Sequence, residues 1–147
     1  MPSKLAISSG QYSDKGRKER NQDFHGILVP PEPQLGAKGI AVALADGISS
    51  SDVSQFASKA AVTGFLEDYF CTPDTWSVRT SAQRVLQAVN SWLHAQTRQG
   101  QHRYDMEKGY VCAFSALVIK SVTAHLFHLG DTRIYRLRGA ALEQLTE

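Results

Sequence analysis

Three aspartates of this chain each stand beside an apolar run, where a carboxylate would be held at the edge of a protein core. Residues 40–47 read Ile-Ala-Val-Ala-Leu-Ala-Asp-Gly, so Asp46 and Gly47 close an uninterrupted apolar stretch. Asp131 follows a second such stretch, and Asp23 precedes a third strand-like segment. An unbroken apolar run is typical of a buried strand, and a glycine after it lets the backbone turn and approach a ligand closely. This arrangement suits a site for a metal ion or a phosphate group.

The three aspartates predict a divalent-cation site if the strand ends that carry them converge. Carboxylates that lie close together repel one another and raise one another's pKa unless a cation neutralises them. Mg²⁺ and Mn²⁺ are hard ions that take oxygen ligands, whereas no histidine pair of the chain has zinc spacing. A pair of such ions can activate a water molecule and hold phosphoryl oxygens for in-line attack.

Each aspartate also has a purely structural interpretation. Aspartate at the end of a strand commonly caps a turn or the start of a helix. Gly130-Asp131-Thr132-Arg133 is itself a plausible β-turn, in which Asp131 and Arg133 could pair. Only the combination of the three positions favours the metal site.

A basic cluster with two open interpretations precedes the first aspartate. It is either a solvated loop or a patch that attracts a phosphate group. The formal net charge of the 147 residues is +2, too small to indicate a nucleic-acid or membrane partner, and no base-stacking aromatic pattern accompanies the cluster. The cluster consists of Lys15, Arg17, Lys18 and Arg20, with Asp14 and Glu19 between them.

The two cysteines and the absence of long apolar runs bear on location. Cys71 and Cys112 have neither metal-binding nor redox spacing. With no secretory signal, they indicate a reducing, cytoplasmic setting. No apolar stretch approaches the roughly 20 residues of a membrane span.

The order of the expected elements predicts an α+β fold. Strands are followed by two helices and then by more strands, which is typical of an antiparallel sheet covered on one side by a helix pair. Ser49, Ser50, Ser51 and Asp52 are candidate caps for the first helix. We expect Phe56 on the buried face of the first helix and Trp92 on the buried face of the second. Short connections at residues 121–122 and 131–132 predict antiparallel hairpins between successive strands. We expect strands at residues 4–9, 24–29, 40–46, 110–120, 123–129, 134–138 and 140–145, and helices at 53–70 and 80–99.

Four motifs in order resemble the metal-dependent type 2C serine/threonine protein phosphatases. They are Asp14-x-Gly16 leading to Asn21-Gln22-Asp23, then Ala45-Asp46-Gly47, the strand at 111–119, and Gly130-Asp131-Thr132-Arg133. The resemblance covers essentially all of residues 1–147. Within that family, the chain is most similar to the N-terminal portion of bacterial two-function proteins, in which this phosphatase domain precedes a protein kinase domain.

The resemblance implies an antiparallel β-sandwich flanked by helix pairs, with a two-metal centre of Mn²⁺ or Mg²⁺ at one edge. Asp46 would bridge the metals and the Gly47 carbonyl would bind one of them. Gln22 and Asp23 would match the acidic pair of the first motif, and Asp131 the aspartate that helps hold a third metal in some members. The implied reaction is hydrolysis of phosphoserine or phosphothreonine in a phosphoprotein, with no covalent enzyme intermediate.

The chain departs from the family pattern in three places. Either Arg17 or Lys18 could stand where the family has an arginine that grips phosphate, and a lysine would supply a point charge in place of a bidentate fork. Ile48-Ser49-Ser50 replaces the usual glycine pair.

The third departure is length, because the sequence stops at Glu147, before two further metal-binding aspartates of the family. It is then either a piece of an enzyme, whose partner could be a kinase domain of the same polypeptide, or a non-catalytic regulatory or binding module. Uncovered strand edges would promote self-association.

Overall fold

The structure, a computed structural model, describes residues 4–147 and confirms the α+β fold class. No helix in that range is both long and apolar enough to cross a membrane. The elements are β1 (Asp23–Leu28), α1 (Gln34–Lys38), β2 (Ile40–Gly47), α2 (Ser54–Cys71), α3 (Val78–Gln99), the 3₁₀ turn η1 (Met106–Lys108), β3 (Cys112–Lys120), β4 (Thr123–Leu129), β5 (Tyr135–Arg138) and β6 (Ala141–Gln144).

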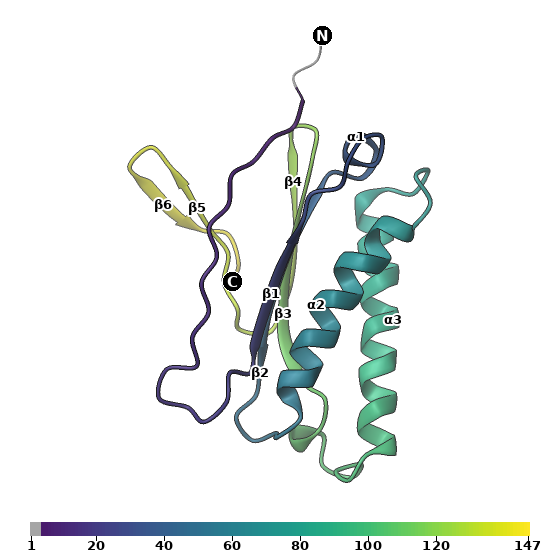
Figure 1. Ribbon diagram of the computed structural model, residues 1–147, viewed down its shortest axis with the longest axis vertical. Coiled ribbons are helices and arrows are strands. Elements are labelled where there is room, and N and C mark those ends of the chain that lie inside the picture. Colours follow the sequence, from purple (N-terminus) through teal and green to yellow (C-terminus); the bar gives the residue numbers. More distant parts are fainter. Residues whose placement is uncertain (1–3) are drawn as a thin grey trace.

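One antiparallel sheet in the order β1-β2-β3-β4 forms the centre of the molecule. Helices α2 and α3 lie against one face of this sheet, and the β5–β6 hairpin stands on the other side (Figure 1). The helix pair on one face is as the sequence predicted. The second layer of the sandwich consists, in the described residues, of the two-stranded β5–β6 sheet.

The alternation of side chains along β2 determines the face of the sheet to which each residue points. Ala41, Ala43 and Ala45 are all buried against α2. Because successive residues of a strand point to opposite faces, Asp46 is directed away from the helices. The small alanine side chains let α2 approach the sheet closely, which a larger residue at these positions would prevent.

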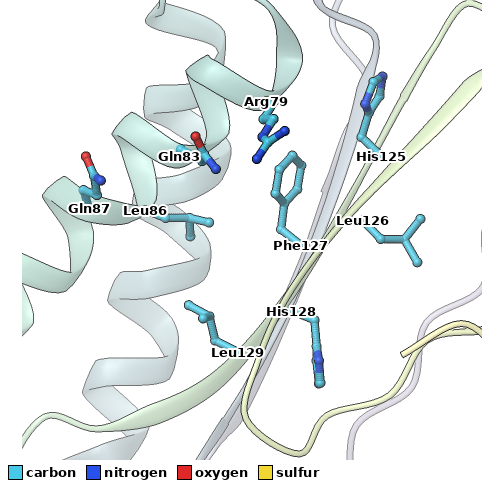
Figure 2. Close-up of a pocket in the computed structure, with 9 residues that line it drawn as sticks. All are labelled: Arg79, Gln83, Leu86, Gln87, His125, Leu126, Phe127, His128 and Leu129. Atoms are coloured by element: carbon cyan, nitrogen blue, oxygen red, sulfur yellow. The ribbon is translucent and has the colours of Figure 1, made fainter. Parts of the chain in front are cut away.

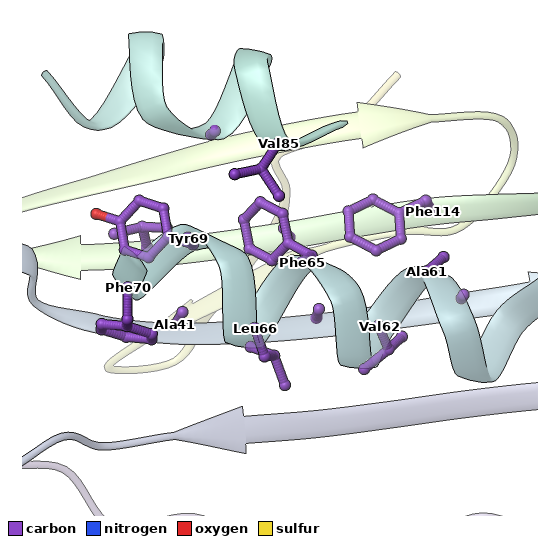
Figure 3. Packing of buried hydrophobic residues seen from close by; sticks show 14 of the residues in the cluster. Ala41, Ala61, Val62, Phe65, Leu66, Tyr69, Phe70, Val85 and Phe114 are labelled. Carbon is purple, nitrogen blue, oxygen red and sulfur yellow. The ribbon is translucent and has the colours of Figure 1, made fainter. Parts of the chain in front are cut away.

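Aromatic residues of α2 fill the space above the alanine face (Figure 3). The ring of Phe65 stacks on Tyr69 at 5.9 Å between centroids and meets Phe114 of β3 edge-on at 5.5 Å. Leu66 and Val62 pack close to Gly26 of β1, where an added Cβ would lie 2.8 Å from the Leu66 Cδ1 atom. The helix is therefore locked onto three strands of the sheet at once.

Several local expectations are wrong, because a local pattern does not determine which tertiary contacts a segment makes. Residues 4–9 form no strand. Helix α2 begins at Ser54, and the N-cap residue Val53 makes no side-chain cap. Phe56 and Trp92, expected on buried helix faces, are 58% and 51% exposed. The short connection at residues 131–132 does not produce a hairpin, since β5 pairs with β6 in a separate sheet.

The side chain of Lys38 ties the start of β2 to the turn between the two long helices. Its buried ammonium donates hydrogen bonds to the Thr72 Oγ1 atom at 2.6 Å and to the Pro73 carbonyl at 2.9 Å. It also lies 5.5 Å from the centroid of the Tyr69 ring, whose hydroxyl donates to the Lys38 carbonyl at 2.8 Å. Burial lowers the pKa of Lys38, so the cation depends on these acceptors for its stabilisation.

Replacing Lys38 with alanine should destabilise the fold, because the Thr72 and Pro73 oxygens would lose their donor. We expect a loss of about 2 kcal/mol in the free energy of unfolding, measured by urea denaturation. Lys59→Ala, at an exposed position of α2, is the matched control and should change little. Equal effects of the two substitutions would contradict a structural role for the buried ammonium.

Candidate metal centre

Strand pairing brings Asp23 and Asp46 together. They are direct register partners on the adjacent antiparallel strands β1 and β2. Burial, a hydrogen bond with Asp23 and the negative charges of Asp23 and Asp131 raise the pKa of Asp46 to about 6, while the charge of Lys18 acts in the opposite direction. Two carboxyl groups therefore share one small region, and they repel each other when both are ionised.

Asp131 lies near this pair without joining it in a compact cluster. Its charge acts on Asp46, yet within residues 4–147 no three His, Cys, Asp or Glu side chains lie close enough together to hold a metal ion. The glycine before it, Gly130, has a φ of 97° and turns the chain after β4. In the described part of the chain Arg133 makes no ion pair with Asp131, and donates instead to the Tyr135 hydroxyl at 3.3 Å.

Gly47 occupies a position that has no room for a side chain. An added Cβ would lie 2.7 Å from the Ser54 Cβ atom and 3.0 Å from both the Cβ and the carbonyl oxygen of Gln22. The Gly47 amide donates to that same carbonyl at 2.9 Å. The backbone after Asp46 is thus clamped between the start of α2 and the residue before Asp23.

Three buried serines hold the loop that connects the Asp46 strand end to α2. Ser54 accepts from the Ile48 amide at 3.0 Å and donates to the Val111 carbonyl at 2.5 Å. Ser58 donates to the Gln22 carbonyl at 2.6 Å, and Ser51 to the Gly109 carbonyl at 2.7 Å. This positioning role was not predicted from the sequence, where its signal is the presence of Ser54 and Ser58 four residues apart on the otherwise apolar face of α2.

Gln22 faces the same connecting loop. Its side chain is only 9% exposed, and the Nε2 atom donates to the Ser51 carbonyl at 2.6 Å. Its own carbonyl accepts from both Gly47 and Ser58. Gln22 therefore couples β1 to the loop after Asp46.

The basic cluster borders the carboxylate pair on the side of this loop. Arg17, Lys18 and Arg20 line a shallow pocket of about 480 Å³ together with residues 49–52. The Lys18 Nζ atom donates to the Ser49 Oγ atom at 3.4 Å. Lys18 is also the basic residue whose charge lowers the pKa of Asp46. Of the two candidates for phosphate contact, Arg17 and Lys18, Lys18 is the one whose charge affects the pKa of Asp46.

A second pocket, of about 330 Å³, opens directly onto the carboxylate pair. The wall of this pocket includes His25 and Arg133, neither of which was predicted from the sequence as a site residue. Its lining residues are Tyr12, Ser13, Asp14, Asp23, Phe24, His25, Leu44, Asp46, Thr132 and Arg133.

Comparison with known families assigns the chain. The sequence family described as protein phosphatase 2C matches residues 11–147. The chain belongs to the protein phosphatase 2C family. No curated protein matches the sequence of this family member.

Solved phosphatase structures share the fold of this protein phosphatase 2C chain. The serine/threonine phosphatase PstP/Ppp of Mycobacterium tuberculosis matches with 21% identity and a TM-score of 0.71, over 92% of this chain and 52% of that one. Stp1 of Staphylococcus aureus matches with 16% identity and a TM-score of 0.71, over 92% and 51%. The PstP catalytic domain in complex with two manganese ions matches with 22% identity and a TM-score of 0.69, over 92% and 53%. The chain therefore spans about half the length of these phosphatases.

The donor groups of this protein phosphatase 2C chain fit a hard divalent cation. Asp23 and Asp46 offer carboxylate oxygens, and the clamped Gly47 offers a carbonyl, which are ligand types that Mg²⁺ and Mn²⁺ prefer. Burial and the neighbouring carboxylates raise the pKa of Asp46, so a bound cation would favour the ionised form of this group. Two carboxylates supply only part of a coordination shell, so water or further residues would complete it.

Replacing Asp46 with asparagine should stabilise the metal-free chain at neutral pH. The folded-state pKa of about 6 lies above the ordinary value of 3.8, so this carboxyl stabilises the fold when protonated, and that stability is lost as pH rises from 3.8 through 6. Because solvent screens part of the repulsion, we expect Asp46→Asn to gain about 1 kcal/mol near neutral pH.

The measurement is thermal and urea unfolding in the presence of a chelator, as a function of pH. The gain should vanish below pH 3.8, where both forms are neutral. Asp68→Asn, at an exposed site on α2, is the control. A loss of stability in Asp46→Asn near neutral pH would show that the two carboxyl groups do not repel each other.

Proposed function

We propose that residues 1–147 are the N-terminal portion of a protein phosphatase 2C domain that hydrolyses phosphoserine and phosphothreonine in proteins with the help of Mn²⁺ or Mg²⁺. The observation that carries the proposal is the pairing of Asp23 with Asp46 across β1 and β2, with the pKa of Asp46 raised to about 6. A carboxylate pair of this kind is costly to a fold unless it binds a cation. Membership of the family makes phosphate-ester hydrolysis the chemistry for which such a cation would serve.

Asp23, Asp46 and the Gly47 carbonyl would hold the metal ions, and Asp131 would add negative charge beside them. Bound divalent ions supply an activated water and neutralise phosphoryl oxygens. Lys18 or Arg17 would orient the phosphate group by hydrogen bonds and charge. Gln22 would act on the site through its contacts with the loop at residues 48–51.

The family assignment supports a proposal for the substrate and the setting as well. The substrate would be a phosphoprotein, and the similar PstP structure holds two manganese ions. A protein kinase domain of the same polypeptide is the partner that the two-function arrangement would provide, in bacterial signalling. The two free cysteines, Cys71 and Cys112, are compatible with the cytoplasmic location expected from the sequence.

A non-catalytic regulatory or binding module is the second candidate. It is favoured by the small donor set, since the described residues offer no group of three acidic or histidine ligands. It is also favoured by Ser49 and Ser50, which replace a flexible glycine pair, and of which Ser50 is bonded to the Glu107 carbonyl at 2.7 Å. Such a module would recognise a phosphoprotein or a neighbouring kinase domain without hydrolysis.

Metal-dependent turnover decides between these candidates. An enzyme should hydrolyse p-nitrophenyl phosphate and a phosphothreonine peptide with Mn²⁺ and lose activity with chelator. Asp46→Asn should then reduce turnover at least about 100-fold, because charge stabilisation at the reacting phosphate is lost. A binding module would show no turnover in either form and would keep its affinity for the peptide in Asp46→Asn.

Mn²⁺ binding can be followed independently of turnover by the change in melting temperature. Mn²⁺ should raise the melting temperature of the unsubstituted chain, because a ligand that binds only the folded state stabilises it. It should have little effect on Asp46→Asn. Equal shifts for both forms would exclude the Asp23–Asp46 pair as the metal site.

Lys18 and Arg17 can be separated by their effects on phosphate binding. Lys18→Ala should weaken binding of inorganic phosphate about tenfold, because a charged hydrogen-bond donor is lost, whereas Arg17→Ala should have a smaller effect. Titration calorimetry in the presence of Mn²⁺ measures both affinities without requiring turnover. A larger loss in Arg17→Ala would assign the phosphate contact to that residue instead.

A further inference from the structure

A groove runs between helix α3 and strand β4, at the edge of the sheet opposite β1 (Figure 2). It has a volume of about 630 Å³. Arg79 and His125 lie at one end, whereas Leu86 and Leu129 lie at the other, with the Phe127 ring between them. The groove therefore has a cation at one end and two leucine side chains, beside Gln87 and His128, at the other.

The strand that forms one wall is an unprotected edge of the sheet. Within residues 4–147, β4 pairs with β3 on one side and with no strand on the other, and its residues 125–129 all line the groove. Its sequence, Thr-Ala-His-Leu-Phe-His-Leu, has none of the lysine or proline residues that usually prevent pairing at an edge. Helix α3 packs mainly on α2 and makes few contacts with β4. The backbone groups on the outer side of β4 are thus available to another strand.

The charges around the groove are of one sign. Arg79 is the only Lys, Arg, Asp or Glu residue that lines it. Helix α3 carries Arg79, Arg84 and Arg98 and no acidic residue over its entire length, and β4 contains no acidic residue either. Within residues 4–147 the Arg79 guanidinium makes no ion pair, since the ion pairs there involve other residues. An incoming carboxylate would therefore meet an uncompensated cation.

We propose that the α3–β4 groove binds an extended acidic segment of a partner protein, which adds to β4 as a further strand. Backbone hydrogen bonds to the β4 edge would supply affinity. An acidic side chain at one end of the segment would pair with Arg79, and an apolar side chain at the other end would pack on Leu86 and Leu129. This surface is separate from the Asp23–Asp46 site, because β4 and β1 lie at opposite edges of the sheet.

The charges favour an acidic partner over a second copy of the chain. Edge-to-edge pairing of two β4 strands would place two α3 helices, each with three arginines and no acid, on the same extended sheet. Like charges brought together in this way oppose association. An acidic segment gains from the same charges.

The test uses a fluorescein-labelled eight-residue peptide of alternating glutamate and valine, and the same peptide with lysine in place of glutamate. Fluorescence anisotropy at low salt should show saturable binding of the glutamate peptide only. Arg79→Glu should weaken that binding about tenfold, because an attractive charge pair becomes repulsive. Arg84→Glu makes the same change at an exposed position of α3 outside the groove, and should alter the affinity by less than about twofold.

Folding of the Arg79→Glu variant is not in question, since Arg79 is exposed and an acid in the first turn of a helix is favourable. Amide shifts in a ¹⁵N-resolved NMR spectrum should concentrate on residues 123–129 when the glutamate peptide is added. Equal losses in the two variants, equal binding of the lysine peptide, or no saturable binding up to about 1 mM, the weak limit of specific recognition, would overturn the proposal. A dimer in sedimentation analysis that Arg79→Glu disrupts would overturn it in favour of self-association.

Discussion

The packing of α2 on the alanine face of β2 is the constraint on which the rest of the structure depends. Ala41, Ala43 and Ala45 admit the helix only because they are small, and strand alternation then directs Asp46 to the opposite face. A shift of register by one residue would exchange the two faces, burying the carboxylate under the helix and exposing the alanines. The same contacts that form the core therefore orient the candidate metal centre.

The carboxylate pair is electrostatically unfavourable when both groups are ionised, and the surrounding backbone holds the two residues next to each other. Asp23 and Asp46 are held as register partners by β1 and β2, so their backbones cannot move apart without breaking the strand pairing. The clamped Gly47 and the buried hydroxyl of Ser54 restrict the strand end further. If this site binds a cation as we propose, much of its backbone is already in place before the cation arrives.

The face of the sheet that carries Asp46 and the α3–β4 edge offer different chemistry. The face that carries Asp46 is acidic and borders the basic loop with Lys18, which suits a metal ion and a phosphate group. The α3–β4 edge is cationic and partly apolar, which suits an extended acidic chain. Because β3 lies between β2 and β4, a partner at the β4 edge would leave access to the carboxylate pair open.

Local patterns in the sequence were enough to predict most helices and strands, the α+β class and the family, because hydrophobic periodicity and short motifs depend on neighbouring residues. They also indicated Asp23, Asp46 and Gly47 as candidates, since each stands beside a strand-like run. Which residues meet across the sheet could not be predicted in this way. The pairing of Asp23 with Asp46, the hydroxyl network of α2 and the separation of β5 from β4 all depend on contacts between segments distant in sequence. For the same reason the failed strand at residues 4–9 and the exposed Phe56 had suitable local patterns but no tertiary partner to bury them.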